Sequence, residues 1–368
     1  MGSLPPLLHL AAPAGSCRSM LTALGCGSTS ELIRLIQQTI GAGYRVTGSA
    51  ALIEADEDEQ HGGRSDDARR AADLQRALAD DRVAGVVTLR GGAWLTRILP
   101  RIDFSVLRRR STRVAIFGFS ELTTVINVAS VYPKAVCWYD MGPAFIPTGL
   151  RMSAQQQRPH VPHPAEGGVG EGTPPGAGTE RSAHEQFPKH LAEFFGDVIA
   201  RMDGRGSSRL IRGQLVAGKL LHKSSARFVG GTLSVLISLI GTAYARSIFR
   251  PGRWLAIEDV NEAPHRLDRA LAHLKLSGIL ERCEGLLLGD FHENEHDRVG
   301  SVLASLDHVL PKRLPVPIVV TRDFGHIWPM APLPIGRTVE LRRCSPGDDG
   351  ATVELVISWR KLATRRSV

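Results

Sequence analysis

Apolar positions in the first 150 residues follow two alternating spacings. The runs Leu7–Ala11, Val83–Leu89 and Arg113–Phe119 are apolar almost throughout, as strands buried on both faces are. Between them, Ser28–Gly41 and Ser65–Asp80 carry apolar residues every three or four positions, which predicts amphipathic helices. Ser28 or Ser30 can cap the first helix and Gly41 can end it. The alternation predicts βαβ units and a parallel sheet. We also expect a strand at 44–46, a helix leading to Asp103 and a helix that begins at Ser120.

The amino-acid composition of the chain changes after Leu150. From Pro159 to Glu180, 11 of 22 residues are Gly or Pro, which predicts a flexible loop or linker before a helix at about 184–202. The remainder has short strand signals, two helix signals and a closing hairpin. We therefore expect an α/β domain at 1–150, a linker at 151–207 and a β-rich domain at 208–368. The expected strands are 213–219, 254–257, 285–288, 316–321, 338–342 and 352–358, and the expected helices are 264–276 and 298–306.

Composition narrows the class of protein. The five cysteines are scattered and include no C-x-x-C pair, which argues against a disulfide framework and a cysteine zinc site and favours reduced thiols in the cytosol. No run approaches about 18 apolar residues, and no basic residue precedes the apolar N-terminal segment, so neither a membrane span nor a signal peptide is expected. The net charge of +8 comes mostly from dispersed arginines, with only seven lysines. Without a lysine-rich run and interleaved aromatics, nucleic-acid binding is not expected.

A first candidate for chemistry is Gly118-Phe119-Ser120, where a buried strand ends and a helix begins. A serine on such a turn is exposed above the sheet, beside free backbone N–H groups that can stabilise an oxyanion. Leu122 stands where the G-x-S-x-G elbow has its second glycine, and a plain helix cap by Ser120 remains open. Arg90-Gly91-Gly92 ends another strand; it is either an ordinary turn or a second source of oxyanion N–H groups.

Two segments of the second half complete a possible triad. Glu258 and Asp259 end an apolar strand, where a buried carboxylate needs a partner such as a histidine; capping of the next helix by Asp259 or Asn261 is the alternative. His326 follows Gly325 just beyond another strand, as a loop-borne base would. Ser120, Glu258 and His326 together supply nucleophile, orienting acid and base at strand ends.

His292-Glu293-Asn294-Glu295-His296 matches the H-E-x-x-H pattern of zinc peptidases. That chemistry needs both histidines on one face of a helix, whereas five polar residues after a strand are typical of a solvated loop. A zinc site is kept as an alternative.

Several ordered segments resemble one family, the serine LD-carboxypeptidases, which include muramoyltetrapeptide carboxypeptidases and microcin C immunity peptidases. The resemblance covers nearly the whole chain except the Gly/Pro segment and the C-terminal tail. The matching segments are 11–14, 80–92, 97–103, 118–123, 142–143, 230–234, 241–242, 258–269 and 325–326.

The resemblance implies a flavodoxin-like N-terminal domain, a smaller β-rich C-terminal domain and an active site in the cleft between them. It also implies Ser120 as nucleophile, Glu258 as orienting acid, His326 as base, and oxyanion-hole N–H groups near Gly92 and Glu121. Homodimers are usual in the family. Three departures bear on specificity: Glu121 replaces the common Asp, Thr232 the usual Asn, and His265 the common Tyr.

The expected function is a cytoplasmic serine carboxypeptidase that releases a C-terminal D-amino acid from a murein tetrapeptide, with no cofactor or metal. A cationic side chain in the cleft would hold the substrate carboxylate. One alternative is hydrolysis of a peptidyl or aminoacyl nucleotide, which benefits from an aromatic residue between the domains; residues 150–230 contain four Phe and no Trp or Tyr. The other is a non-catalytic protein that binds anionic ligands.

Overall fold

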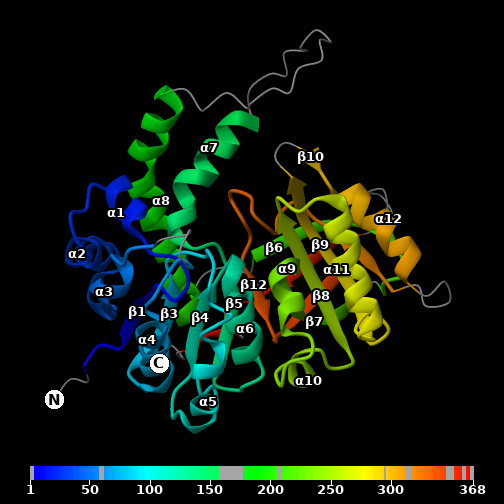
Figure 1. Cartoon of the computed structure of the whole chain (residues 1–368), viewed down its shortest axis with the longest axis horizontal. Coiled ribbons are helices and arrows are strands. Elements are labelled where there is room, and N and C mark those ends of the chain that lie inside the picture. The colour runs from blue at the N-terminus through cyan, green and yellow to red at the C-terminus, as the bar shows by residue number, and fades with distance from the viewer. Residues whose placement is uncertain are drawn as a thin grey trace.

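The N-terminal half forms a six-stranded sheet of order β12-β5-β4-β3-β1-β2 (Figure 1). Five strands are parallel, in agreement with the expected parallel sheet, although no strand was expected at β5. β12 pairs antiparallel with β5 at one edge. Residues 333–335, far from the rest in sequence, thus complete this sheet. Its strands are β1 (Leu7–Ala11), β2 (Arg45–Gly48), β3 (Val83–Thr88), β4 (Val114–Gly118), β5 (Ala135–Tyr139) and β12 (Leu333–Ile335).

This computed structural model describes most of the chain, and all structural statements below concern its described residues. They are 4–57, 62–156, 177–205, 209–221, 223–293, 296–310, 316–344, 352–358 and 362–364. Most of the Gly/Pro segment, the hairpin turn at 346–350 and most of the tail lie outside them.

Helices cover both faces of the first sheet. Phe117 and Gly118 are neighbours in β4 and point to opposite faces. The Arg201 guanidinium of α8 lies 5.0 Å from the Phe117 ring, whereas a Cβ at Gly118 would meet Leu122 and Ile126 beside α6. The helices of this half are α1 (Arg18–Ala23), α2 (Thr29–Ile40), α3 (Ala50–Ile53), α4 (Asp67–Ala79), α5 (Val106–Arg109), α6 (Thr123–Ser130), α7 (Ile146–Gln156) and α8 (Ala177–Asp203).

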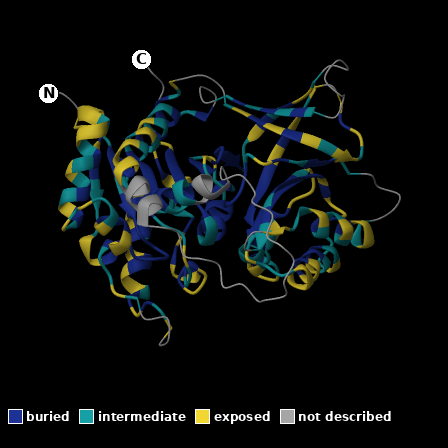
Figure 2. Ribbon diagram, turned by 90° about the horizontal axis from the view of Figure 1, so that it is seen from above, coloured by how far each residue is buried: buried dark blue, intermediate teal, exposed yellow. Residues whose placement is uncertain are grey.

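The C-terminal half forms an eight-stranded sheet of order β10-β9-β11-β6-β14-β13-β7-β8. Because β8 also pairs with β9, the sheet closes on itself like a barrel. Figure 2 shows buried strands at the centre of both halves. The strands are β6 (Arg209–Ala217), β7 (Lys223–Thr232), β8 (Arg253–Val260), β9 (Cys283–Glu293), β10 (His296–Asp297), β11 (Ile318–Val320), β13 (Thr338–Arg343) and β14 (Thr352–Ile357). The helices are α9 (Leu233–Leu236), α10 (Ala245–Ile248), α11 (Pro264–Leu276) and α12 (Val299–Val309).

The expected fold class, a parallel α/β half followed by a β-rich half, is confirmed. The local expectations hold where the periodicity is strong: α11 has the expected bounds, and Ser28 caps α2 by accepting a hydrogen bond from the Glu31 N–H. The expected helix before Asp103 is only a short 3₁₀ turn, Leu99–Arg101, centred on Pro100. The domain boundaries at 150 and 207 stay a prediction.

No helix of the described residues combines the length and the apolar character that crossing a bilayer requires.

The two halves meet where α6 lies against the end of β7. The Asn127 side-chain amide donates to the Gly230 carbonyl at 2.7 Å, and its oxygen accepts from the Gly230 N–H at 3.0 Å. The Thr232 N–H donates to the Thr123 hydroxyl at 3.1 Å. Gly231 lies between these bonds with a φ of +128°, and a Cβ there would lie 2.8 Å from the Tyr139 ring and even closer to the Thr123 hydroxyl. The close approach of the halves therefore requires glycine at this position.

Gly231→Ala should destabilise the protein by about 2–4 kcal/mol, because backbone strain adds to overpacking at the junction. Gly241→Ala is the matched control: its φ of +84° is also positive, but a Cβ there has no atom within 4 Å. Urea unfolding of both variants measures the difference. Equal losses of unfolding free energy would show that the junction is not tightly packed.

Candidate active site

Ser120 lies on a strained turn between β4 and α6. Its φ of +56° is in the left-handed region, which non-glycine residues adopt rarely and mostly at functional sites. A short 3₁₀ turn, Ser120–Leu122, follows and leads into α6. Leu122, in the place of the elbow's second glycine, is fully buried, and the space for the turn comes from Gly118, where a Cβ would lie 2.7 Å from the Leu122 Cβ. The turn is therefore a strand-to-helix elbow built with a different glycine.

The end of β3 comes close to this elbow. A Cβ on Gly91 would lie 2.7 Å from the Ser120 Cβ, so only glycine permits the contact. The Gly91 carbonyl accepts a hydrogen bond from the Gly15 N–H at 2.9 Å, which fixes the loop, and Gly92 follows with a φ of +123°. The two segments that the sequence singled out separately thus lie side by side.

Glu258 and His326 form a buried ion-pair geometry. Glu258 lies near the end of β8 with no exposed surface, and its Oε2 lies 2.7 Å from the His326 Nδ1. Its other oxygen, Oε1, accepts hydrogen bonds from the Tyr139 hydroxyl at 2.5 Å and the Thr232 hydroxyl at 2.8 Å. The carboxylate is held by three side chains from β5, β7 and the loop after β11, so its position and the orientation of the imidazole are fixed.

The charges of this pair support one another. Burial alone would raise the pKa of Glu258, but the His326 charge and the three hydrogen bonds outweigh it and hold that pKa below its ordinary value. Burial opposes protonation of His326, yet the Glu258 carboxylate raises the pKa of the imidazole above its ordinary value. Burial and the nearby carboxylate keep the pKa of Tyr139 well above 10, so its hydroxyl remains a hydrogen-bond donor.

Ser120 and His326 line the same cavity, of about 240 Å³. Gly92 and Arg90 line it too, and the Phe119 ring packs on the imidazole with 4.4 Å between the ring centroids. Glu258 lies behind His326 and does not line the cavity. The structure therefore brings together all three residues of the expected triad and Gly92 in an arrangement suited to nucleophilic chemistry.

Two other carboxylates near the site have structural partners. The Glu121 side chain accepts hydrogen bonds from the Leu95 N–H and the Thr96 hydroxyl, and burial raises its pKa. Asp259 accepts from the N–H and the hydroxyl of Ser234 at the start of α9; burial and the neighbouring Glu258 raise its pKa to about 7. The suggested capping of α11 by Asp259 is wrong, because the residue before that helix is Ala263, and no side chain caps it.

The helical zinc alternative is contradicted by the backbone. His292 belongs to β9 and His296 to β10, and the two strands form an antiparallel pair in which Asp297 faces His292. The Nδ1 of His292 bonds to Asp290. The two histidines therefore do not share a helix face, and the described residues contain no cluster of three or more His, Cys, Asp or Glu suited to a metal ion.

Two family models match the chain. The N-terminal domain of the LD-carboxypeptidases matches residues 9–138 and their C-terminal domain matches residues 225–341. The chain belongs to the LD-carboxypeptidase family. This membership supports a serine peptidase in general, and the two matched domains carry Ser120 on one side and Glu258 and His326 on the other.

Relatives of this LD-carboxypeptidase extend over most of its length. A Bacillus subtilis protein named "Probable murein peptide carboxypeptidase" is 26% identical over 311 residues, which is 83% of this chain and 82% of the relative. Muramoyltetrapeptide carboxypeptidase from Oxalobacter formigenes has a TM-score of 0.61 at 22% identity, covering 96% of this chain and 98% of its own. An MccF-like protein from Bacillus anthracis has a TM-score of 0.63 at 16% identity, covering 97% and 98%. The two structures show that the fold is shared.

The sequence did not reveal every residue of the site. Tyr139 ends an apolar strand and carries no signal of a polar role, and Thr232 was noted only as a departure from the family pattern. Arg90 was noted as part of a turn, whereas its side chain lines the cavity. His265, the third departure, is exposed in the first turn of α11 and does not line the cavity.

Glu258→Gln should lower the pKa of His326, because the carboxylate that raises it is gone and burial, which lowers it, remains. Titration of the histidine ring protons by NMR measures the shift. Asp73→Asn is the matched control, since it removes a carboxylate 2.9 Å from another histidine, His9, and should leave the His326 curve in place. An unchanged titration curve of His326 in the Glu258→Gln variant would contradict the pairing of His326 with Glu258.

Proposed function

We propose that this LD-carboxypeptidase is a serine carboxypeptidase that hydrolyses an L,D-peptide bond and releases C-terminal D-Ala from a murein tetrapeptide in cell-wall recycling. The observation that carries the proposal is the shared cavity of Ser120 and His326, with Glu258 bound to the far side of the imidazole. The reaction needs no metal or cofactor.

In the proposed mechanism, the Ser120 hydroxyl attacks the carbonyl carbon of the L-residue while the His326 Nε2 accepts its proton. Glu258 accepts a hydrogen bond from the Nδ1–H, which orients the ring and stabilises the imidazolium that forms. The imidazolium then protonates the leaving amine of D-Ala, and an acyl-enzyme remains on Ser120. Water, deprotonated by His326, attacks the ester and restores the serine.

The oxyanion of each tetrahedral intermediate would be stabilised by the backbone N–H groups of Gly92 and Glu121. Gly92 lines the cavity, and Glu121 directly follows Ser120 at the start of the helical turn. The Glu121 carboxylate is held by Leu95 and Thr96, so its own backbone N–H is the part of the residue assigned to catalysis.

Arg90 is the cation that we assign to the substrate carboxylate. Its side chain lines the cavity and is 42% exposed, so part of its guanidinium can reach a ligand. Its Nη1 donates to the Ser16 carbonyl at 3.1 Å and lies 3.6 Å from Glu57, which fixes one side of the group. A guanidinium so held can bind a carboxylate in a charge-assisted pair.

The aromatic residues of 150–230 give no support to a nucleotide substrate; those that line the Ser120 cavity are Phe119 and Phe145. Phe187, Phe195 and Phe228 are fully buried, so they are not exposed for stacking on a base; Phe194, which is half-buried, lines a different cavity of about 390 Å³ with Trp328. The murein peptide carboxypeptidase name of the Bacillus subtilis relative supports the peptide. Structural likeness to a microcin C7 self immunity protein keeps hydrolysis of a peptidyl or aminoacyl nucleotide as the alternative.

The proposal also places the enzyme in the cytoplasm as a homodimer. Four free cysteines, Cys17, Cys26, Cys137 and Cys283, support a reducing compartment.

Mass spectrometry of tetrapeptides that differ only in the chirality of the C-terminal alanine tests the reaction. We expect release of D-Ala and not of L-Ala, and loss of at least about 10³-fold of kcat/KM in Ser120→Ala. Ser238→Ala, an exposed serine outside the cavity, is the control and should retain activity. Cleavage of the L-form alone overturns the proposal. Faster hydrolysis of an aminoacyl sulfamoyl adenylate would favour the nucleotide alternative, and absence of both activities and of fluorophosphonate labelling would favour a binding protein.

Arg90→Gln should raise KM for the tetrapeptide about 10–100-fold, since a charge-assisted hydrogen bond contributes roughly 1.5–3 kcal/mol. The control is the same tetrapeptide with a C-terminal amide, which has no carboxylate to bind; the wild type and the variant should cleave it with similar kcat/KM. Equal losses on both substrates would show that Arg90 does not recognise the carboxylate.

A further inference from the structure

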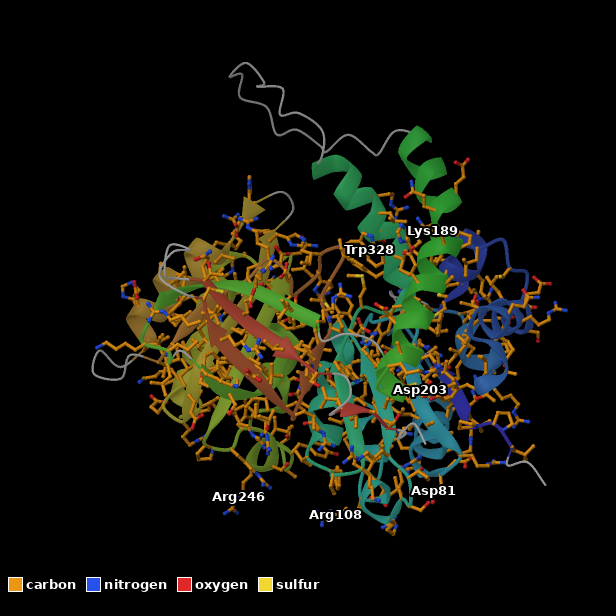
Figure 3. The ribbon with its side chains drawn as sticks, turned by 180° about the vertical axis from the view of Figure 1, so that it is seen from behind. Asp81, Arg108, Lys189, Asp203, Arg246 and Trp328 are labelled. Atoms are coloured by element: carbon orange, nitrogen blue, oxygen red, sulfur yellow. The ribbon has the colours of Figure 1, made fainter. Side chains whose placement is uncertain are left out.

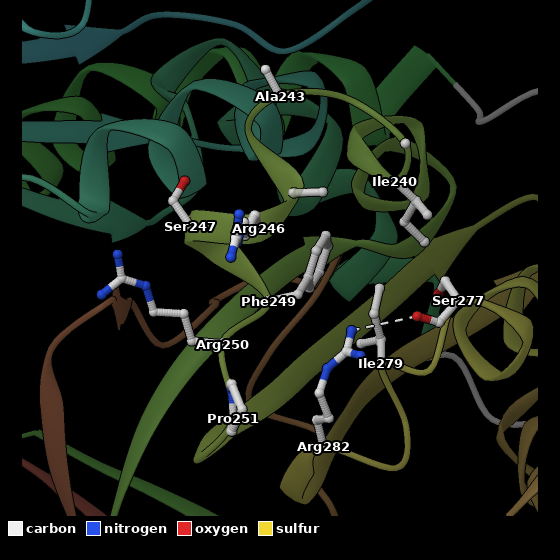
Figure 4. Close-up of a pocket in the computed structure, with 12 residues that line it drawn as sticks. Ile240, Ala243, Arg246, Ser247, Phe249, Arg250, Pro251, Ser277, Ile279 and Arg282 are labelled. Atoms are coloured by element: carbon white, nitrogen blue, oxygen red, sulfur yellow. Dashed lines mark hydrogen bonds between the residues drawn. The ribbon is translucent and has the colours of Figure 1, made fainter.

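A second hollow, of about 990 Å³, lies away from the triad in the C-terminal half (Figure 4). It is formed by the segment 240–251 around α10 and by the loop 277–282 between α11 and β9. These segments precede β8 and β9, so the hollow lies at the amino ends of these strands, whereas Glu258 lies near the carboxyl end of β8. Five residues of extended chain, about 17 Å, separate Arg253 from Glu258. The hollow is thus distinct from the Ser120 cavity.

The lining combines an apolar floor with cationic walls. Phe249 and Ile279 are buried and Pro251 closes one side. Arg246, Arg250 and Arg282 also line the hollow, and none of the lining residues is acidic. In Figure 4 the Arg282 guanidinium turns toward Ser277, whereas the Arg250 side chain extends away from Phe249. An apolar surface combined with a few polar groups is a composition that ligand pockets share.

The arginines of this hollow lack carboxylate partners among the interactions of the described residues. The Arg282 guanidinium donates to the Ser277 carbonyl at 3.4 Å, and its charge acts together with Lys275 to lower the pKa of Glu281. Glu281, next to it in sequence, bonds to Lys275 instead. Glu284 lies near Gly252, outside the lining. No acidic side chain is therefore placed to neutralise Arg246 and Arg250 within the hollow.

Further arginines surround the same end of the molecule. Arg250 and Arg227 are close enough to Arg253 for their charges, together with burial, to lower its pKa. In Figure 3, Arg246 and Arg108 lie at one end of the molecule, away from Trp328 and α7. Like charges held together repel one another, and a bound anion relieves that repulsion.

We propose that this hollow binds an organic phosphate, a phosphate ester joined to an apolar or aromatic body. The planar guanidinium groups of Arg246, Arg250 and Arg282 would bind the phosphate oxygens through paired N–H groups, and the body would lie on Phe249 and Ile279. A soluble phosphate ester and a lipid headgroup share this chemistry. The inference does not depend on the reaction at Ser120.

The test uses the full chain and two probes. Fluorescence anisotropy measures binding of an N-methylanthraniloyl derivative of ADP, and co-sedimentation measures binding to vesicles of phosphatidylcholine with and without phosphatidic acid. The variant R246Q/R250Q/R282Q should weaken binding of the probe that binds wild type by roughly 30-fold or more, as loss of charge-assisted bonds predicts. Binding of the nucleotide alone indicates a soluble ligand, and binding of the anionic vesicles indicates a lipid headgroup.

The matched control is R34Q/R82Q/R109Q, which removes the same charge from exposed arginines that pair with carboxylates in the N-terminal half. It should bind the probe within about twofold of wild type, and both variants should keep the thermal stability and peptidase rate of wild type. Equal losses in both triple variants would show non-specific charge attraction and overturn the proposal. Failure of the wild type to bind either probe also overturns the proposal. So does the finding that the wild type is a dimer and R246Q/R250Q/R282Q a monomer, because the hollow would then be a subunit interface.

Discussion

The buried carboxylate of Glu258 is the constraint on which the site depends. A charge without water is stable only when hydrogen bonds replace its hydration. Here the donors are His326, Tyr139 and Thr232, of which Tyr139 belongs to the first sheet and the other two to the C-terminal half. The charge is therefore satisfied only when the two halves are docked, so the reactive geometry and the packing of the halves are one structural property.

The geometry of the site in turn depends on backbone that lacks side chains at a few positions, of which Gly231 lies at the junction of the halves. Gly91 admits the Ser120 side chain, Gly231 admits Thr123 and Tyr139, and Gly325 comes so close to Asp290 that a Cβ would lie 2.8 Å from its side chain. Each of these glycines lies beside a residue of the triad or beside one of its donors. Because these positions carry no side chain, segments that are remote in sequence come into contact there, which a larger residue would prevent.

The sequence predicts the framework of this protein better than it predicts the supporting contacts. Strands β1, β3 and β4 are apolar throughout and are flanked by amphipathic helices, so their positions in the chain and the parallel sheet follow from periodicity. Ser120, Glu258 and His326 stand out because each polar residue follows an apolar run. Tyr139 gives no such signal, since its ring looks like one more buried aromatic and only the fold shows its hydroxyl facing Glu258. β7 was missed because its first half is polar, and its pairing partners β8 and β13 lie later in the chain.

The edge strand β12 has a consequence for the order in which the protein forms. Its three residues cover the exposed side of β5, yet in the chain they follow every other strand of that sheet and most strands of the second sheet. Until these residues are made, the first sheet presents an open edge of unpaired backbone groups, which can template pairing with another chain. The N-terminal half is therefore exposed to aggregation during synthesis for as long as the barrel-like half is being made, and its protection arrives together with the loop that carries His326.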